Sequence, residues 1–280
     1  MHKVLLLGAE GLLGSNVSYS LTNREDIDLI KTSRNISSDL YFNYTIKSLN
    51  HLLKRTKPDF VINCTGSTSV SSSFLDMLKV NSFLPLHLAV LGHSRRVKVI
   101  HIGSNAVFSG FRKSNSEKSV PFPLTRYGLS KLIGDLSSFH NLVIRTSFVG
   151  LSRYRQVNRG ILEKLKALPN DSTFHIQENF TWNGLTADSL SEFIASSLSI
   201  IPFPNGVIHV VADGKLTRLE LIETLLVQLD RSDVTVKVSQ TKSVKNMSLD
   251  TEKRKLISKI WAASRYGTTP KILRLLQELP

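Results

Sequence analysis

The first apolar run of the chain is followed at once by three glycines at a spacing of three. The segment VLLLGAEGLLGS places Gly8, Gly11 and Gly14 between a buried strand and a helix that begins at Leu12. Such a turn brings the backbone close to a pyrophosphate, and the helix N-terminus adds free N–H groups and a partial positive charge. We therefore predict a dinucleotide site here, rather than a plain glycine-rich turn, lined by Gly8, Gly11, Leu12 and Leu13.

Short apolar runs alternate with helical stripes through the first half of the chain. The runs predict strands at residues 4–8, 27–30, 60–64, 97–103 and 141–146. The stripes predict helices at residues 12–22, 45–56, 74–92 and 125–139, the third of them bent near Pro85. This alternation predicts a doubly wound, Rossmann-like α/β domain, with a parallel sheet and helices on both faces.

The second half is less regular and indicates a smaller, mixed unit. Helices are expected at residues 159–167, 187–198, 219–229 and 270–278, and strands at 173–177, 207–211 and 234–238. We predict a dinucleotide-binding domain over residues 1–150 and a smaller substrate-binding portion over residues 151–280. Segments at about 187–211 are expected to return to the main domain, and the two portions together form a cleft.

The charge balance restricts the class of partner. The chain has 36 Lys and Arg against 22 Asp and Glu, a net charge of +14, so an anionic partner is expected. The basic residues are scattered, without zinc-finger spacing or an aromatic-interleaved basic motif, which disfavours nucleic acid. A small polyanion, such as a dinucleotide or a nucleotide diphosphate, fits better.

Several common signals are absent from the sequence. Cys64 is the only cysteine, so no internal disulfide is expected, and the eight histidines do not cluster with cysteine or acids, so no metal is expected. The apolar run at the N-terminus is too short for a secretory signal, and no run approaches the roughly 18 residues of a membrane span. We expect a soluble, cytoplasmic protein that binds no membrane.

The residues after the second predicted strand bear on the choice of dinucleotide. An acid about 20 residues beyond the glycine loop would hold a ribose 2′-hydroxyl and favour NAD. That position holds Ser33, and Arg34 follows. A hydroxyl and a guanidinium suit a 2′-phosphate, because Arg binds phosphate oxygens in a bidentate manner. NADP is therefore the preferred cofactor and NAD a second option, unless Arg34 is only a solvated loop residue.

The segment TRYGLSK places Tyr127 and Lys131 four residues apart, on one face of a predicted helix. Reduction of a ketone needs a hydride, which a cofactor carries, and a proton for the oxygen. A free tyrosine has a pKa near 10, and we expect the Lys131 ammonium to lower that pKa. Ser104, at the end of the preceding strand, can donate to the carbonyl oxygen. We expect glycine at position 128 because a side chain there would collide with the cofactor or with neighbouring backbone.

The alternative is that Tyr127 and Lys131 lie on an ordinary helix surface without a chemical role.

Several motifs occur in one order along the chain: the glycine loop, PDFVINCTG, VNSFLP, HIGSNAVFSG, YGLSK, VIRTSFVG and WNGLT. Together they resemble the extended short-chain dehydrogenase/reductases that act on nucleotide sugars, and within these the dTDP-4-dehydrorhamnose reductases and related sugar-nucleotide reductases. The resemblance covers most of residues 1–190, and NMSLDTEKRK extends it to residues 246–255. It implies an NAD(P)H-dependent reductase of a nucleotide-linked 4-keto-6-deoxy sugar.

The resemblance also implies roles for single residues. Ser104, Tyr127 and Lys131 fall on the catalytic positions, and Lys131 also reaches the nicotinamide ribose. Beside Ser33 and Arg34, the implied cofactor positions are Asp39, Thr65, Gly66 and Ser67. Asp39 matches the acid that meets the adenine ring, and Asn81 matches an asparagine that braces the neighbouring strand.

The chain departs from the family where substrate is expected. The family usually reads STDYVFDG where this chain has GSNAVFSG, and tryptophan where Phe148 stands. Asn105 and Ala106 cannot act as acid or base, which disfavours the dehydration that related enzymes perform. The predicted substrate residues are Asn105, Phe148, Asn158, Arg159 and Trp182. Asn158 and Arg159 belong to the basic stretch NRGILEKLKAL. We expect Trp182 either to stack on the base of the nucleotide or to pack in the core.

Two further functions stay open at this stage. A nucleotide-sugar epimerase uses the same Tyr, Lys and Ser set but retains NAD tightly. A non-catalytic NADP-binding regulatory subunit could share the fold. The oligomeric state is also open, with a homodimer as one option.

If Arg34 binds the 2′-phosphate, the enzyme should have a lower KM for NADPH than for NADH. Replacing Arg34 by Ala should raise the KM for NADPH and leave the KM for NADH nearly unchanged, because only the former carries the phosphate. Steady-state kinetics with both cofactors test this. Equal KM values in the unsubstituted protein would contradict the predicted NADP preference.

Overall fold

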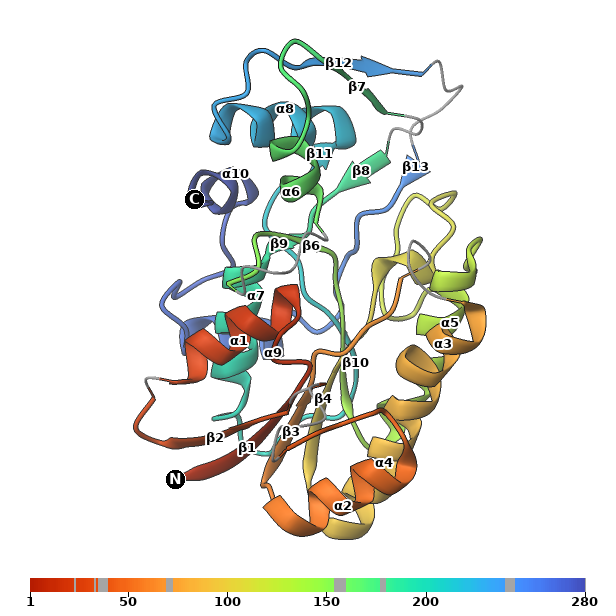
Figure 1. Cartoon of the computed structure of the whole chain (residues 1–280), viewed down its shortest axis with the longest axis vertical. Helices are drawn as coiled ribbons and strands as arrows, with labels where there is room; N and C mark the ends of the chain where they lie inside the picture. The colour runs from red at the N-terminus through yellow and green to blue at the C-terminus, as the bar shows by residue number, and fades with distance from the viewer. Residues whose placement is uncertain are drawn as a thin grey trace.

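Six parallel strands form the central sheet of the computed structural model (Figure 1). Their order is β10-β5-β4-β3-β1-β2, so the chain leaves β1 toward one edge and then returns to extend the sheet in the other direction. This is the predicted doubly wound arrangement. The structure describes residues 1–22, 24–32, 34, 40–68, 73–153, 160–176, 180–239 and 245–279.

The elements of the first half alternate as expected. The sheet strands are β1 (His2–Leu7), β2 (Ile27–Lys31), β3 (Phe60–Asn63), β4 (Lys98–Ile102), β5 (Leu142–Arg145) and, from the second half, β10 (Gly206–His209). The helices are α1 (Leu12–Thr22), α2 (Ile46–Thr56), α3 (Phe74–Leu78), α4 (Leu84–Arg95) and α5 (Arg126–Asp135). Short turns of other helix types are the π-helical η1 (Lys79–Phe83) and the 3-10 turns η2 (Asn105–Val107) and η3 (Leu136–Phe139).

Apolar side chains cover both faces of the sheet, because successive residues of a strand point to opposite sides. In β1, Val4 and Leu6 belong to the larger buried cluster, which also holds Leu13 of α1. Leu5 and Leu7 belong to a second cluster, which the leucines of α2 and α4 complete. The near-continuous apolar runs in the sequence therefore reflect strands that are buried on both faces.

The second half contains the remaining elements. They are β6 (Phe148–Val149), α6 (Ile161–Lys166), β7 (Thr173–Ile176), β8 (Phe180–Trp182), β9 (Leu185–Thr186), α7 (Ala187–Ser197), β11 (Leu216–Thr217), α8 (Arg218–Gln228), β12 (Thr235–Val238), β13 (Lys245–Asn246), α9 (Arg254–Ala262) and α10 (Ile272–Gln277). Three small sheets form among them: β8 lies between β11 and β13, β7 pairs with β12, and β6 pairs with β9.

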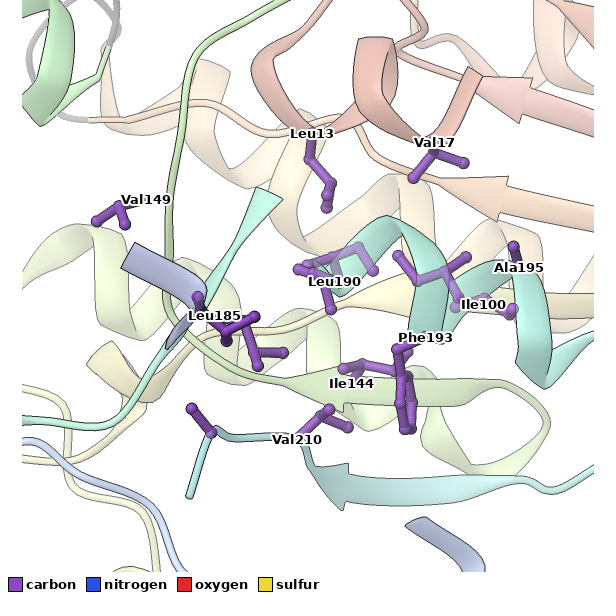
Figure 2. Close-up of a cluster of buried hydrophobic side chains, with 14 of the residues drawn as sticks. Leu13, Val17, Ile100, Ile144, Val149, Leu185, Leu190, Phe193, Ala195 and Val210 are labelled. Atoms are coloured by element: carbon purple, nitrogen blue, oxygen red, sulfur yellow. The ribbon is translucent and has the colours of Figure 1, made fainter. Parts of the chain in front are cut away.

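Two elements of the second half pack on the main domain. Helix α7 lies against α1, and β10 pairs with β5 at the edge of the large sheet. Figure 2 shows the resulting core, in which Leu13 and Val17 of α1 lie on the side of Leu190 of α7, while Phe193 of α7 points toward the strands. The domain boundary at residue 150 remains a prediction.

The helix predicted over residues 74–92 is interrupted. Helix α3 passes through the π-helical turn η1 into α4, and Pro85 follows that turn immediately. Proline has no N–H to donate to the carbonyl four residues earlier, here Asn81, and its ring crowds that carbonyl. A wider turn at this point is the usual structural response.

The same helical run corrects the expectation about membrane spans. Among the described residues, the stretch Phe74–Arg95 is long and apolar enough to cross a membrane by length and composition. This stretch is nevertheless a core helix of the folded domain, because Leu84 and Leu88 are fully buried against the sheet.

Glycine at position 134 allows α5 to lie directly against η1. A Cβ at Gly134 would collide with the Asn81 carbonyl oxygen and approach Pro85 Cγ at 3.2 Å. Replacing glycine by alanine within an exposed helix should stabilise it by about 1 kcal/mol. Here we expect Gly134→Ala to destabilise the protein by about 2–3 kcal/mol instead, because backbone must move. Urea unfolding measures the difference.

A matched control is Gly92→Ala in α4. The nearest atoms to a Cβ at Gly92 are Val99 Cγ2 at 3.0 Å and the Val97 carbonyl oxygen at 3.2 Å, which are close contacts without the direct overlap found at Gly134. Gly92→Ala should therefore destabilise the protein clearly less than Gly134→Ala does. Equal effects of the two substitutions would show that the close contact of α5 with η1 is not a constraint on stability.

Candidate active site

A cleft of about 1020 Å³ runs along the carboxyl ends of the strands and continues between the large sheet and the smaller sheets. The turn between β1 and α1 and the loop after β3 form one part of its wall. Residues of η2, α5, β6, β8, α8 and β13 form the rest. In parallel α/β sheets ligands bind at this edge, and here the strand order reverses between β1 and β3.

The glycine loop has the backbone geometry that its sequence predicts. Gly8 has a φ of +80°, and its carbonyl accepts a hydrogen bond from the Gly11 N–H at 3.0 Å. A Cβ at Gly14 would collide with the Gly8 carbonyl oxygen, so only glycine lets α1 pack this closely on β1. Gly8, Gly11, Leu12 and Leu13 all line the cleft.

The loop after β3 forms the next part of the wall. Thr65, Gly66 and Ser67 line the cleft, and the Asn63 side chain holds Thr65 through its backbone N–H at 3.1 Å. The Asn81 side chain accepts from the Ser67 N–H at 3.0 Å and donates to the Ser67 carbonyl at 2.7 Å. Asn81 therefore braces this loop.

The predicted cofactor positions beyond β2 are only partly described. Arg34 is exposed and lines the same cleft as the glycine loop. Ser33 and Asp39 lie outside the described residues. Within the described part, the polar groups and the tight glycine turn fit a dinucleotide, since backbone alone occupies the space beside the N-terminus of α1.

Tyr127, Lys131 and Ser104 come together at the middle of the cleft. Thr125 caps α5 by accepting from the Gly128 N–H at 3.0 Å, which fixes the start of the helix one residue before Tyr127. A Cβ at Gly128 would collide with the Ala106 carbonyl oxygen. The glycine therefore provides clearance from neighbouring backbone, one of the two reasons expected from the sequence.

Ser104 reaches Tyr127 from the end of β4. Ser104 is extended and caps η2, where its hydroxyl oxygen accepts from the Ala106 N–H at 3.1 Å. It is buried, and its hydroxyl acts on the side chain of Tyr127, which lines the cleft, by lowering the pKa of the phenol. The serine thus contacts the tyrosine from behind the cleft surface.

Burial has the largest effect on the pKa of Tyr127. Loss of solvent raises the pKa of Tyr127 above its ordinary value, the Ser104 hydrogen bond opposes this rise, and the negative charge of Asp135 adds to it. Tyr127 therefore keeps its proton at neutral pH. That state suits a proton donor.

The expected tuning of Tyr127 by Lys131 is not what the structure shows. The pKa of Tyr127 is raised instead of lowered, with burial as the largest cause. The Lys131 ammonium is itself buried and donates to the Ile102 carbonyl at 3.0 Å. Desolvation lowers the pKa of Lys131 to about 8, while Asp135 and Cys64 raise it. Near neutral pH the lysine is charged, close to its titration point.

A buried ion pair lies behind the lysine. Asp135 follows Lys131 by one helical turn, and its carboxylate accepts from Arg145 Nε at 2.7 Å, with both side chains almost fully buried. The negative charge of Asp135 favours the ammonium form of Lys131. Cys64 also lines the cleft, but burial raises the pKa of its thiol to about 12, so it is a neutral thiol and a poor nucleophile.

The predicted substrate residues divide into two groups. Asn105, Phe148 and Trp182 line the cleft, whereas Asn158 and Arg159 lie outside the described residues. The Trp182 side chain is buried, and its Nε1 donates to Ser147 Oγ at 2.8 Å, so the indole packs in the wall and is fixed there. The Asn105 side chain donates to the Met247 carbonyl at 2.9 Å.

Sequence reasoning missed the residues that form the far wall of the cleft. They are Phe180 of β8, Arg218 of α8, and Lys245 and Met247 of the last strand region. Lys164 of α6, which belongs to the basic stretch NRGILEKLKAL expected near the cleft, lines the same wall. The Arg218 guanidinium stacks on Phe180 at 5.3 Å from the ring centre. These residues carry no local motif, because they converge only when the small sheets form. No group of three or more metal-binding side chains occurs in the part of the chain that the structure describes.

A protein-family model, the RmlD substrate binding domain, matches residues 1–261. The chain belongs to this family. A comparison with curated protein sequences found no match. The family match extends over both the glycine loop and the far wall of the cleft.

Several solved structures have the same fold. A dTDP-4-dehydrorhamnose reductase from Clostridium acetobutylicum matches with a TM-score of 0.81 at 19% identity, covering 99% of this chain and 97% of that one. The enzyme of the same name from Bacillus anthracis, in complex with NADP, has a TM-score of 0.81 at 18% identity and covers 100% and 98%. A UDP-glucuronic acid 4-epimerase from Bacillus cereus, with UDP-glucuronic acid and NAD, has a TM-score of 0.76 at 18% identity and covers 98% and 96%. At these identities the likeness shows the fold.

The buried charge of Lys131 predicts a dependence of stability on pH. Its pKa in the folded chain, about 8, lies below the value near 10.4 of an unfolded lysine, so between these values the unfolded state binds more protons and stability rises with pH. We expect Lys131→Met to stabilise the protein at pH 7 by about 1–3 kcal/mol. This advantage should shrink as the pH approaches 10.

Urea unfolding of both proteins from pH 7 to pH 10 measures this difference. Lys54→Met, at an exposed position of α2, is the control and should show no such trend. A Lys131→Met advantage that is absent at pH 7, or that stays constant to pH 10, would contradict a depressed lysine pKa.

Proposed function

We propose that the protein is an NADPH-dependent reductase of a nucleotide-linked 4-keto-6-deoxy sugar. One observation carries the proposal: Tyr127, on the same helix and one turn from the buried Lys131, lines the cleft between the glycine loop and the far wall. A carbonyl placed there has a hydroxyl donor beside it. The family match and the NADP complex of the Bacillus anthracis enzyme support the same reaction class.

The residues of the chain perform the proton half of the reduction. NADPH, when bound, supplies the hydride. Tyr127 is protonated at neutral pH and donates its proton to the oxygen that becomes a hydroxyl. Ser104 holds the phenol and stabilises negative charge on the reacting oxygen. Lys131 lies one helical turn from Tyr127, and the buried Asp135 favours its ammonium form.

Cofactor residues fall on one part of the cleft wall. Gly8, Gly11 and the start of α1 would hold the pyrophosphate, and Lys131 would hold the nicotinamide ribose. Arg34 would bind a 2′-phosphate, which supports NADP over NAD. Ser33 and Asp39 remain predicted cofactor residues.

The far wall suits the nucleotide diphosphate of the substrate. Lys164, Arg218 and Lys245 bring positive charge to the far wall of the cleft, and Glu10 lines the cleft at the glycine loop. A diphosphate matches this charge. Phe148 and Asn105 would then lie beside the sugar, next to the catalytic tyrosine. Asn158 and Arg159 stay predictions for the same region.

The test is oxidation of NADPH with a panel of dTDP-, GDP-, UDP- and CDP-linked 4-keto-6-deoxy sugars, followed at the absorbance band of the reduced nicotinamide. We expect turnover with one or more members. Tyr127→Phe should lower kcat by roughly 10² to 10⁴ and leave NADPH binding intact, because it removes only the donated proton.

Three outcomes would decide against the reductase. Near-wild-type turnover in Tyr127→Phe would reject the tyrosine as the proton donor. NAD that co-purifies tightly, with interconversion of sugar epimers and no net oxidation of NADPH, would indicate an epimerase. NADPH binding without turnover on any member of the panel would indicate a regulatory subunit.

A further inference from the structure

Residues 245–250, called the bridging segment below, connect the two sides of the cleft. On one side β13 pairs with β8 of the small sheet, in register Lys245 to Phe180 (Figure 1). On the other side the segment is hydrogen-bonded to the loop that follows η2. Lys245 and Met247 both line the cleft. The position of this segment therefore sets the distance between the catalytic residues and the far wall.

Asn246 makes the contacts to the main domain. Its backbone N–H donates to the Gly110 carbonyl at 2.7 Å. Its side-chain Nδ2 donates to the carbonyls of Arg112 at 3.1 Å and Lys113 at 2.8 Å. Its own carbonyl accepts from Asn115 Nδ2 at 2.9 Å. One side chain thus satisfies two loop carbonyls that have no strand partner.

The same residue makes contacts to the small sheet. Asn246 Oδ1 accepts from Thr181 Oγ1 at 2.7 Å, and it also accepts from the backbone N–H of Ser248 at 3.2 Å and from the Ser248 hydroxyl. The two ends of one amide group therefore bind opposite sides of the cleft. An amide is the group that can do this, since it has donors and an acceptor at fixed spacing.

The packing around Gly110 leaves little room for an alternative position. Gly110 has a φ of +82°, and a Cβ there would meet Lys245 Cβ at 3.0 Å and Met247 Sδ at 3.1 Å. The loop and the bridging segment are thus in direct contact on either side of Asn246. The Met247 carbonyl also accepts from Asn105, which follows Ser104 in the chain.

We infer that Asn246 is a positioning residue for the sugar-nucleotide, because its amide fixes Lys245, Met247 and Asn105 relative to the catalytic tyrosine. It acts through these neighbours and does not itself line the cleft. This inference rests on the proposed function for its substrate. Among the described residues, Asn246 makes no hydrogen bond to the glycine loop. Replacing Asn246 should therefore leave cofactor binding unaffected.

The first measurement is steady-state kinetics of Asn246→Ala with the panel sugar that the wild type reduces. We expect the KM for that sugar to rise about tenfold or more, as the five hydrogen bonds of the Asn246 amide are lost, with the Kd for NADPH changed by less than about twofold. Thr181→Val keeps the side-chain shape and removes one hydrogen bond, so it should show an intermediate rise.

Asn141→Ala is the control for loss of a hydrogen-bonded asparagine away from the cleft. Asn141 donates to the Pro85 carbonyl at 3.2 Å and does not line the cleft. It should lower the unfolding temperature without changing the KM for the sugar. An unchanged KM in Asn246→Ala, or a KM rise equal to that of Asn141→Ala, would overturn the inference.

Hydrogen exchange separates this inference from the proposed function. In Asn246→Ala we expect faster amide exchange in residues 105–113 and 245–249, with no change in residues 4–22. If the wild type reduces no panel sugar, the proposed function fails, and the exchange result still decides the role of Asn246. Unchanged exchange in both segments, or faster exchange across the whole chain, would overturn it.

Discussion

The geometry of the candidate site depends on the direct contact of helix α5 with backbone on two sides. At its start, Gly128 lies against the Ala106 carbonyl, and near its end Gly134 lies against the Asn81 carbonyl. Side chains at either position would push the helix away from the sheet. Because the helix is held this closely, Tyr127 reaches Ser104 and the Lys131 ammonium is buried against the end of β4.

That burial has an electrostatic consequence that the spacing of the residues does not reveal. In water a lysine next to a tyrosine would lower the tyrosine pKa, but the desolvated environment raises it and brings the lysine pKa down to about 8. The ion pair of Asp135 with Arg145 places a negative charge one helical turn beyond the lysine. The chain by itself therefore holds a protonated tyrosine next to a lysine that is charged near neutral pH.

Much of the fold and half of the site could be read from local sequence. Helix α1 has the predicted bounds, and the buried strands β1, β3 and β5 were visible as unbroken apolar runs, since a strand covered on both faces needs no polar alternation. Strands of two or three residues, such as β8 and β13, are too short to show any period. Helix α9 was also not predicted. Pro85 interrupts an otherwise helical stripe at η1. The sequence predicted a bend near this proline but did not predict the π-helical form of the turn.

By itself the sequence determined the glycine turn and the placement of Tyr127 and Lys131 on one helical face, because both are local: three glycines within one turn, and two side chains one helical turn apart. Tertiary structure alone decided the far wall of the cleft and the protonation of Tyr127 and Lys131. Lys164, Arg218, Lys245 and Met247 come from separate elements that meet only through long-range pairing. A pKa likewise depends on how much solvent the folded chain removes, which no spacing of residues encodes.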